Sequence, residues 1–273
     1  MPELPEVETY VNYFRPLLEG RRIVRYVTRW AKQAAPSAAA VRRGVTGKRV
    51  ARLRRRAKFV VADLVVGQTN GRGDGHLLIH LRMSGSFRWA ADRADEPPHV
   101  RAFFELDDGN RWLFCDARKF GRIIYTTDFD AAVAHLGLEP LGDEFTLGRF
   151  TRLLRERSRL LKPMLLDQAL VAGLGNIYVD ESLHLAGLHP LRRSDTLTNE
   201  EISKLRRTIR SVLRKAISLG GTSFDWVYPD GGMERHLTAY GRAGEPCKKC
   251  RTKIERQVVG QRGTHVCPKC QPL

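Results

Sequence analysis

Residues 247–270 read CKKCRTKIERQVVGQRGTHVCPKC, and their cysteine spacing decides the fold of the C-terminal end. Two C-x2-C pairs separated by sixteen residues have the spacing of a zinc ribbon, in which four thiolates form one tetrahedral site. The residues between the pairs predict two short strands around Gly260–Gly263, a hairpin too small to be stable without metal. We therefore expect one structural zinc ion (Zn2+) bound by Cys247, Cys250, Cys267 and Cys270.

The chain is strongly basic. Its 47 Lys and Arg against 30 Asp and Glu give a net charge of +17 and a pI near 10.2. Such a charge favours nucleic acid as the partner, ahead of a membrane surface or a merely basic exterior. Residues 42–58 contain nine Lys or Arg and no acid, and the chain from His236 onward contains eight basic residues against two acidic ones. We expect both stretches to contact DNA phosphates.

The N-terminal sequence and the cysteines indicate a cytoplasmic protein. MPELPEVETY carries acids and prolines where a signal peptide has a basic and then an apolar stretch. No apolar run approaches the roughly 20 residues of a membrane-spanning helix. In a reducing compartment a disulfide framework is the poorer interpretation of the cysteines. Cys115 lies apart in the apolar run WLFC and is expected in the core.

Hydrophobic periodicity divides the chain into a β part and a helical part. Residues 4–19 have apolar positions at helical spacing, and residues 23–125 form short alternating segments separated by turns, which favours an antiparallel sandwich or barrel. Helices are predicted after about residue 130. They are expected near residues 146–157, 162–171 and 176–186, and in a stripe from Ile202 to Ala216 that a capping box of Thr198 and Glu201 begins and Gly220-Gly221 ends.

These segments predict an α+β multidomain fold. The composition, 42% hydrophobic and 28% charged, is that of an ordinary globular protein. We expect a β-sandwich domain with an N-terminal helix, a linker, a helical domain and a zinc ribbon. The predicted boundaries are 1–132, 133–148, 149–235 and 236–273.

The N-terminus has its own chemistry. Methionine before proline is normally removed, which would leave Pro2 with a free secondary amine. Such an amine can attack a sugar C1′ and form an iminium that drives elimination of the strand phosphates. Glu3 would follow directly as a proton-exchanging group. From chemistry alone, an ordinary N-terminus before a helix is the simpler interpretation.

Five motifs favour the first interpretation. PELPEVET, HLRMSG, DARKFG, LVAGLGNIYVDESL and YGRAGEPC followed by the paired cysteines occur in this order nearly end to end. The chain thereby resembles bacterial formamidopyrimidine-DNA glycosylase, the 8-oxoguanine repair family. The resemblance implies a β-sandwich, a helix-two-turns-helix domain and a zinc finger. It also implies base excision followed by β,δ-elimination, in the bacterial cytoplasm on nucleoid DNA.

The resemblance implies a role for each matching residue. Pro2 is the nucleophile, Glu3 its acid–base partner and Lys58 the strand lysine at the phosphates beside the lesion, with Glu6 in support. Met83, Arg118 and Phe120 would fill the gap left by a flipped nucleotide, where a thioether and a ring replace stacking and a guanidinium bonds the orphaned base. The remaining DNA-contact positions are His80, Lys162, Asn176, Tyr240 and Arg262.

Two departures from the family pattern are visible. Ala117 stands where the family commonly has proline, and the stretch from Gly221 to Tyr240, which in the family covers the flipped base, is shorter than in many relatives. The ranking of 8-oxoguanine against formamidopyrimidines therefore stays open.

The expected activity is that of a bifunctional glycosylase and abasic lyase on oxidised purines in duplex DNA, acting as a monomer. An endonuclease VIII-type enzyme for oxidised pyrimidines is the near alternative, against which PELPEVE argues. A non-enzymatic zinc-ribbon DNA-binding protein is the distant one.

Overall fold

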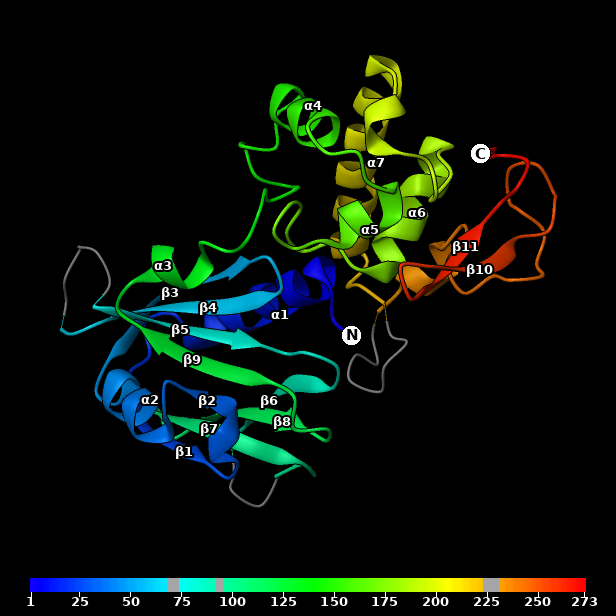
Figure 1. The fold of residues 1–273 in the computed structure, drawn as a ribbon. Helices are drawn as coiled ribbons and strands as arrows, with labels where there is room; N and C mark the ends of the chain where they lie inside the picture. Colours follow the sequence, from blue (N-terminus) through cyan, green and yellow to red (C-terminus); the bar gives the residue numbers. More distant parts are fainter. Residues whose placement is uncertain (68–73, 92–95, 223–230) are drawn as a thin grey trace. The chain divides into compact units, whose positions relative to one another are not determined.

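The computed structural model describes residues 1–67, 74–91, 96–222 and 231–273. The chain forms two compact units (Figure 1). The N-terminal unit contains Met1–Pro2 and Glu6–Ala134, and the C-terminal unit contains Glu3–Pro5 and the described residues from His135 onward. Helix α1 (Leu4–Leu18) is the predicted N-terminal helix, and its first two residues belong to the C-terminal unit. Among the described residues, no helix combines the length and apolar character needed to cross a membrane.

The N-terminal unit is a β-sandwich, as the alternating segments predicted. One sheet has the order β1-β7-β8-β6 and the other β2-β9-β5-β4-β3, and every pairing is antiparallel except β2 with β9. The strands are β1 (Ile23–Thr28), β2 (Ala34–Ala35), β3 (Arg49–Arg56), β4 (Phe59–Val65), β5 (Gly75–His80), β6 (Gly85–Ala90), β7 (Val100–Leu106), β8 (Arg111–Asp116) and β9 (Arg122–Thr126).

One core joins the two sheets and α1. Val7 and Val11 of α1 are fully buried in the same cluster as Ile79 of the five-stranded sheet and Trp112 of the four-stranded sheet. The ring of Trp112 stacks on Phe87 with centroids 4.5 Å apart. Burial of such large rings supplies much of the stability of a domain of this size. Cys115 is buried in a neighbouring cluster on the other face of its sheet, so the prediction that it is a core residue is confirmed.

Three short helices interrupt or follow the strands, and sequence periodicity missed them. They are η1 (Ala31–Gln33), α2 (Ala38–Val45) and α3 (Phe129–Val133). Ser37 caps α2 by accepting a hydrogen bond from the Ala40 amide at 3.1 Å. Gly44 lets this helix lie against the ring of Tyr125, because a β-carbon there would be 2.4 Å from the ring. The Ser37 cap was a local signal that the prediction did not use.

The C-terminal unit begins with four helices around their own core. Phe150, Leu165, Tyr178 and Ile209 are fully buried in one cluster, one from each helix. The helices are α4 (Leu147–Arg155), α5 (Leu161–Leu166), α6 (Asn176–Ala186) and α7 (Asn199–Ser218), with short turns η3 (Ser194–Thr196) and η4 (Met233–His236). The predicted capping box of Thr198 and Glu201 is present in full.

The helix predicted at 162–171 was too long. α5 ends at Leu166 because the next side chain competes with the helix for backbone donors: Asp167 Oδ1 accepts from the Ala169 amide at 3.0 Å. Gln168 then donates to the Leu166 carbonyl, which satisfies an acceptor at the helix end, and to the Leu174 carbonyl.

The predicted hairpin between the cysteine pairs is confirmed. β10 (Glu255–Val259) pairs antiparallel with β11 (Arg262–Val266). Gly260 and Gln261 form the two-residue turn, both with positive φ (55° and 63°), as a type I′ turn requires. The hairpin thus presents Arg262 directly after its tip.

Candidate functional site

The carboxylate of Glu3 caps helix α6. Its Oε1 accepts a hydrogen bond from the Ile177 amide at 3.0 Å, and its Oε2 accepts one from the Tyr178 amide at 3.4 Å. Glu3 is 3% exposed, so this contact is made out of water. A helix N-terminus favours an anion at this position, since its first amides have no partner within the helix. Glu3 is therefore held in one place on the C-terminal unit.

The Gly-Leu-Gly motif forms the seat for Glu3 and Leu4. A β-carbon on Gly175 would lie 2.3 Å from the carboxyl carbon of Glu3, and one on Gly173 would lie 2.8 Å from the Leu4 side chain. The Leu4 amide donates to the Gly173 carbonyl at 3.0 Å. Gly173 also has φ = +94°, which side chains rarely adopt.

This arrangement changes what the start of α6 can offer a phosphate. The resemblance implied a DNA contact for Asn176, but the Ile177 and Tyr178 amides that follow it donate to Glu3 and not to a phosphate. Asn176 itself donates from Nδ2 to the Gly263 carbonyl at 2.9 Å. At the start of α6, Asn176 can therefore offer a phosphate only its own side chain and its own backbone amide.

Pro2 directly precedes Glu3 in the chain. It is buried, whereas Met1 before it is 39% exposed. While Met1 is attached, the nitrogen of Pro2 is an amide and has no nucleophilic lone pair. Glu6, in the first turn of α1, is 2% exposed. Glu6 and Pro2 belong to the N-terminal unit.

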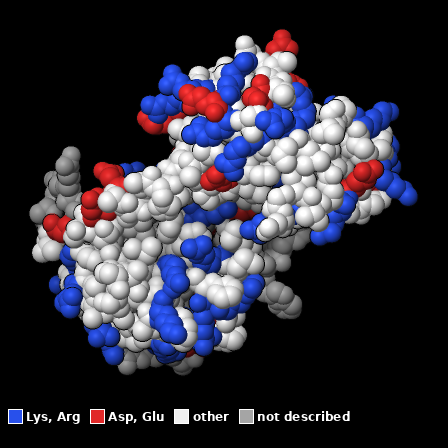
Figure 2. Space-filling view, viewed as in Figure 1, with Lys and Arg blue, Asp and Glu red and all other residues white. Residues whose placement is uncertain are grey.

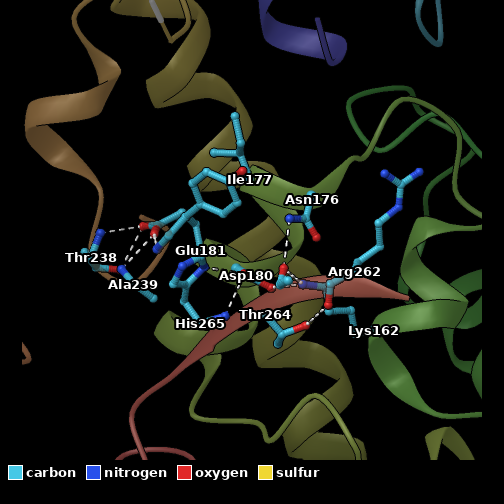
Figure 3. A network of polar contacts seen from close by, with 12 residues as sticks. Lys162, Asn176, Ile177, Asp180, Glu181, Thr238, Ala239, Arg262, Thr264 and His265 are labelled. Atoms are coloured by element: carbon cyan, nitrogen blue, oxygen red, sulfur yellow. Dashed lines mark hydrogen bonds and ion pairs between the residues drawn. The ribbon is translucent and has the colours of Figure 1, made fainter. Parts of the chain in front are cut away.

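Lys162 lies in the interior, where it forms a buried ion pair. Its Nζ donates to Asp180 Oδ1 at 2.6 Å and to the Gly263 carbonyl at 3.0 Å (Figure 3). Burial lowers the pKa of Lys162, and the Asp180 carboxylate opposes that shift. Asp180 Oδ2 accepts from the His265 amide at 2.9 Å. The resemblance implied a DNA contact for Lys162, but its side chain is 0% exposed and holds the hairpin instead.

Arg262 occupies the exposed position that this ion pair supports. It pairs with Val259 across the hairpin, and it precedes Gly263, whose carbonyl accepts from both Lys162 and Asn176. The backbone on its C-terminal side is therefore tied to α5 and α6, while its own side chain faces outward (Figure 3). Arg262 therefore lies exposed directly after the hairpin turn, with the backbone that follows it held in place.

Glu181 organises the segment that carries Tyr240. Its Oε1 accepts from the Ala239 and Tyr240 amides, each at 2.8 Å, and its Oε2 accepts from the Thr238 amide and hydroxyl, each at 2.8 Å (Figure 3). The ring of Tyr240 packs edge-on against His265, with centroids 5.1 Å apart. Asp180 and Glu181 were not predicted as site residues; two adjacent acids directly after the run Ile177–Val179 were the available signal.

The four predicted zinc ligands come together. Their sulfurs all lie within 4.8 Å of one another, with Cys250 to Cys267 at 3.4 Å and Cys247 to Cys270 at 4.0 Å. A tetrahedral zinc with bonds of about 2.3 Å spaces its sulfurs about 3.8 Å apart. The donor set and its dimensions therefore fit one structural zinc ion. An all-thiolate tetrahedron leaves no position for substrate.

In the N-terminal unit, Lys58 and His80 lie at the same end of the strands of the five-stranded sheet. Lys58 is in the two-residue turn between β3 and β4 and is 6% exposed. The next residue, Phe59, pairs with His80 and packs edge-on against its ring at 4.8 Å. Burial lowers the pKa of His80 to about 3, with contributions from the charges of Arg82 and Lys58. His80 is thus neutral at physiological pH.

The proton of the neutral His80 ring can be assigned. Its Nδ1 lies 3.0 Å from the Arg82 amide, which can only donate, so Nδ1 is the acceptor. The proton of the imidazole therefore resides on Nε2, which makes that nitrogen a hydrogen-bond donor.

Met83, Arg118 and Phe120 are exposed on two turns of this unit. Met83 is 39% exposed and Phe120 is 49% exposed, although isolated residues of these types are usually buried. The guanidinium of Arg118 lies 4.8 Å from the centre of the Phe120 ring. The two turns thus present a thioether, an aromatic ring and a cation to solvent.

A buried aspartate that the sequence analysis missed holds both turns. Asp116 is 1% exposed and accepts from Ser84 Oγ at 2.5 Å, from the Arg118 amide at 3.2 Å and from the Gly121 amide at 2.7 Å. The Arg118 amide also reaches Ser84 Oγ at 3.1 Å. An Asp that opens a turn motif with Gly five residues later was the sequence signal.

The basic stretch 42–58 is only partly available to a partner. Arg54 pairs with Asp63 at 2.7 Å, and Arg55 pairs with Glu8 at 2.8 Å. Arg42, Arg43 and Arg52 are exposed. Figure 2 shows Lys and Arg distributed over both units with acidic side chains between them, so the positive charge is not confined to one segment.

Comparisons with known proteins agree along the whole chain. Residues 1–123 match the formamidopyrimidine-DNA glycosylase N-terminal domain, 136–227 its H2TH domain and 244–273 the zinc finger found in FPG and IleRS. The formamidopyrimidine-DNA glycosylase of Chloroflexus aggregans is 43% identical over 280 residues, covering 100% of this chain and 99% of that protein. That of Deinococcus radiodurans is 40% identical over 287 residues, covering 100% and 98%.

Solved structures lead to the same family. The Lactococcus lactis enzyme bound non-covalently to DNA with an AP site is similar with a TM-score of 0.90 and 34% identity, covering 99% of this chain and 100% of that one. A MutM complex with DNA containing carbocyclic 8-oxo-G has a TM-score of 0.90 and 34% identity over 100% of both chains. With this agreement in sequence, fold and zinc ligands, the chain belongs to the formamidopyrimidine-DNA glycosylase family.

Proposed function

We propose that this protein is a bifunctional DNA glycosylase and AP lyase that removes oxidised purines from duplex DNA with Pro2 as its nucleophile. The observation that carries the proposal is the capping of α6 by Glu3, which follows Pro2 in the chain. Family membership, with DNA-bound relatives, supports the substrate class. The setting we propose is the bacterial cytoplasm, with the protein acting as a monomer on nucleoid DNA.

The chemistry begins once Met1 has been removed. The secondary amine of Pro2 attacks C1′ of the damaged nucleotide and gives up its proton, and the glycosidic electron pair leaves with the base, which takes up a proton. The C1′–O4′ bond then opens, the sugar oxygen takes up a proton, and the nitrogen lone pair forms the C1′ iminium. The resulting iminium acidifies the C2′ hydrogen, so loss of that proton expels the 3′ phosphate, and a second elimination expels the 5′ phosphate. Glu3 is the proposed proton carrier for these steps, because it follows Pro2 directly in the chain and its carboxylate is fixed by the amides of α6.

The N-terminal unit supplies the proposed contacts around the lesion. Lys58 and the Nε2–H donor of His80 would contact phosphates, because both lie at the same end of the strands of the five-stranded sheet. Met83, Arg118 and Phe120 would occupy the space that a flipped nucleotide leaves, since their exposed apolar surface and cation suit a base stack. Glu6 supports the N-terminal segment.

The C-terminal unit supplies the proposed backbone contacts. Arg262, Asn176 and Tyr240 would bind the phosphates of the duplex, and Lys162 would act through the hairpin that it holds. We propose functional domains at 1–132, 149–235 and 236–273 with a linker at 133–148. Residues 223–230 of the stretch 221–240, which the family uses over the flipped base, lie outside the described residues.

Borohydride trapping tests the proposal. We expect a covalent adduct with a duplex carrying 8-oxoguanine opposite cytosine, and no adduct from Pro2→Gly, which keeps an N-terminal amine but not the secondary one. A stronger adduct with thymine glycol would instead assign the endonuclease VIII-type activity. Intact protein mass that retains Met1, without trapping on either substrate, would support a DNA-binding protein that is not an enzyme.

A further inference from the structure

Trp30, in the loop after β1, lies beside the turn of residues 117–121 that carries Arg118 and Phe120. The ammonium nitrogen of Lys119 in this turn is 4.6 Å from the centre of the half-buried Trp30 ring, and that of Lys32 is 5.6 Å from it. The face of an indole attracts cations at these distances. The exposed turn therefore makes a specific contact with a segment that is distant in sequence.

The loop that carries Trp30 is fixed to the four-stranded sheet. Gln33, which is fully buried, donates from Nε2 to the Thr28 hydroxyl at 2.9 Å and to the Arg101 carbonyl at 3.0 Å. The Trp30 amide donates to the same hydroxyl at 3.3 Å, and the Trp30 carbonyl accepts from the Gln33 amide at 3.1 Å. Because both backbone groups of Trp30 are bonded, its ring offers Lys119 a fixed surface.

The same loop also contacts the chain where the turn ends. β2 pairs in parallel with β9, and the guanidinium of Arg122, the first residue of β9, donates to the Lys32 carbonyl. The buried Asp116 accepts from two amides of the turn. The turn is therefore held by Asp116 through its backbone and by the Trp30 loop through side chains.

The backbone of Lys119 needs such support. Its φ is +60°, in the left-handed region that residues other than glycine seldom adopt. Such a conformation persists only where the surroundings impose it. Ala117, at the start of the turn, does not fix its own φ as a proline would. The contact with Trp30 supplies a restraint that the residues of the turn lack.

We propose that Trp30 is a positioning residue for the turn of residues 117–121, which it holds through Lys119 in the conformation that presents Arg118 and Phe120. The inference rests on the proposed role of these two side chains in the space that a flipped nucleotide leaves. A turn ordered before binding loses less conformational entropy on the DNA than a loose one. Trp30 thus strengthens binding to DNA with a gap in its base stack, without contacting the DNA itself.

Binding to two duplexes tests this role. One duplex carries a stable tetrahydrofuran abasic analogue opposite cytosine, and the other is undamaged. We expect Trp30→Ala to bind the abasic duplex about 2- to 5-fold more weakly, as for loss of one exposed cation–π contact, and to bind the undamaged duplex like wild type. Tyr13→Ala is the matched control, because it removes an aromatic ring that is 62% exposed on α1. Equal losses on both duplexes would assign Trp30 a general DNA contact and overturn the proposal.

Variants of Lys119 separate the cation from the backbone. Asparagine adopts the left-handed region readily but has no charge, so Lys119→Asn should lose as much affinity for the abasic duplex as Trp30→Ala. Lys119→Arg keeps a cation over the ring and should bind like wild type. Wild-type affinity in Lys119→Asn would show that backbone preference alone shapes the turn, against the proposal.

A proline at position 117 separates rigidity from contact. Proline fixes φ at the start of the turn, and Asp116 before it is in a strand, the conformation that precedes proline most easily. In the Ala117→Pro background, Trp30→Ala should therefore no longer weaken binding to the abasic duplex. An undiminished effect of Trp30→Ala in that background would contradict a positioning role.

Trypsin cleavage of the free protein examines the turn without DNA. Cleavage after Arg118, followed by mass spectrometry, should be about 2- to 5-fold faster in Trp30→Ala and unchanged in Tyr13→Ala, because a protease requires local opening. Faster cleavage with unchanged affinity for the abasic duplex would confirm that Trp30 holds the turn and would disprove the gap-filling role of Arg118 and Phe120. Cleavage of Trp30→Ala at the wild-type rate would overturn the inference.

Discussion

A β-carbon on Gly175 would lie 2.3 Å from the carboxyl carbon of Glu3, closer than any two such atoms can approach. The backbone of Gly175 is extended (φ −137°), so alanine would meet no conformational strain there. The conflict is with one carboxylate at the end of a side chain. Position 175 therefore controls where Glu3 lies, through volume alone.

We expect Gly175→Ala to displace the Glu3 carboxylate from the start of α6. Base excision should fall by at least 100-fold while duplex binding stays within a factor of three, because the DNA-contacting side chains are not touched. Single-turnover kinetics and fluorescence anisotropy measure the two quantities. Gly148→Ala is the control, since a β-carbon there meets nothing within 4 Å. Full activity in Gly175→Ala would show that the capped position of Glu3 is not the working one.

The His80 ring should stay neutral well below the pH at which a histidine usually takes up a proton. Its pKa of about 3 means that its NMR resonances should not shift between pH 8 and 5. In the unfolded chain His80 takes up a proton near pH 6.5, whereas in the folded chain it stays neutral until about pH 3. The free energy of unfolding therefore decreases as the pH falls from 6.5 towards 3. At pH 5.5 the loss is up to about 1.4 kcal/mol. His80→Gln should lack that part of the loss, and His135→Gln should retain it.

Removing the Asp116 carboxylate should loosen both exposed turns. Asp116→Ala leaves the buried Gly121 amide and the Ser84 hydroxyl without their acceptor, so we expect a loss of about 3 kcal/mol in unfolding free energy. Affinity for a lesion duplex should fall with it, since Arg118 is carried on one of the turns. Ser84→Ala should cost about 1 kcal/mol. Thermal melting checks that Asp116→Ala loses more unfolding free energy than Ser84→Ala, with Asp108→Ala as a control in an exposed turn. Equal losses in Asp116→Ala and Ser84→Ala would contradict the prediction.

Salt dependence distinguishes support from contact at Lys162. Arg262→Gln should reduce the slope of log affinity against log salt by about 1, as expected for one phosphate contact. Lys162→Met should leave the slope unchanged but lower stability by about 3–5 kcal/mol, because Asp180 becomes an unpaired buried charge. Binding titrations from 50 to 200 mM salt, roughly the range over which phosphate contacts weaken most, provide the measurement. A reduced salt slope in Lys162→Met would show that this lysine contacts a DNA phosphate directly.

Zinc removal should abolish DNA binding and leave the β-sandwich folded. Among the described residues, the buried cluster at the cysteine end of the hairpin consists of Cys247, Ile254 and Cys267, which is too small a core to keep the segment between the cysteine pairs folded without metal. Cys267→Ser should therefore lose zinc and duplex affinity, while fluorescence of buried Trp112 keeps its native unfolding transition. Cys115→Ser should retain zinc, because that thiol lies in a sheet of the sandwich. Unchanged affinity in zinc-free Cys267→Ser would contradict the role of the metal.

Features made by neighbours in the chain were determined by the sequence alone. The cysteine pairs, the Thr198–Glu201 box and the Gly260–Gln261 turn need only a few consecutive residues, so their signals are local. The β-sandwich followed from alternation along each strand, since one face of a sheet must be buried.

Only the tertiary structure decided how distant residues are used. The capping of α6 by Glu3 joins residues 174 positions apart, and no periodicity marks such a pair. Lys162 was indistinguishable from a surface lysine until its burial with Asp180 was known. Likewise Trp30 is an ordinary loop residue in sequence, and only the fold places the ammonium nitrogen of Lys119 4.6 Å from the centre of its ring. Burial and charge pairing are properties of the folded chain, because they depend on which surfaces exclude water.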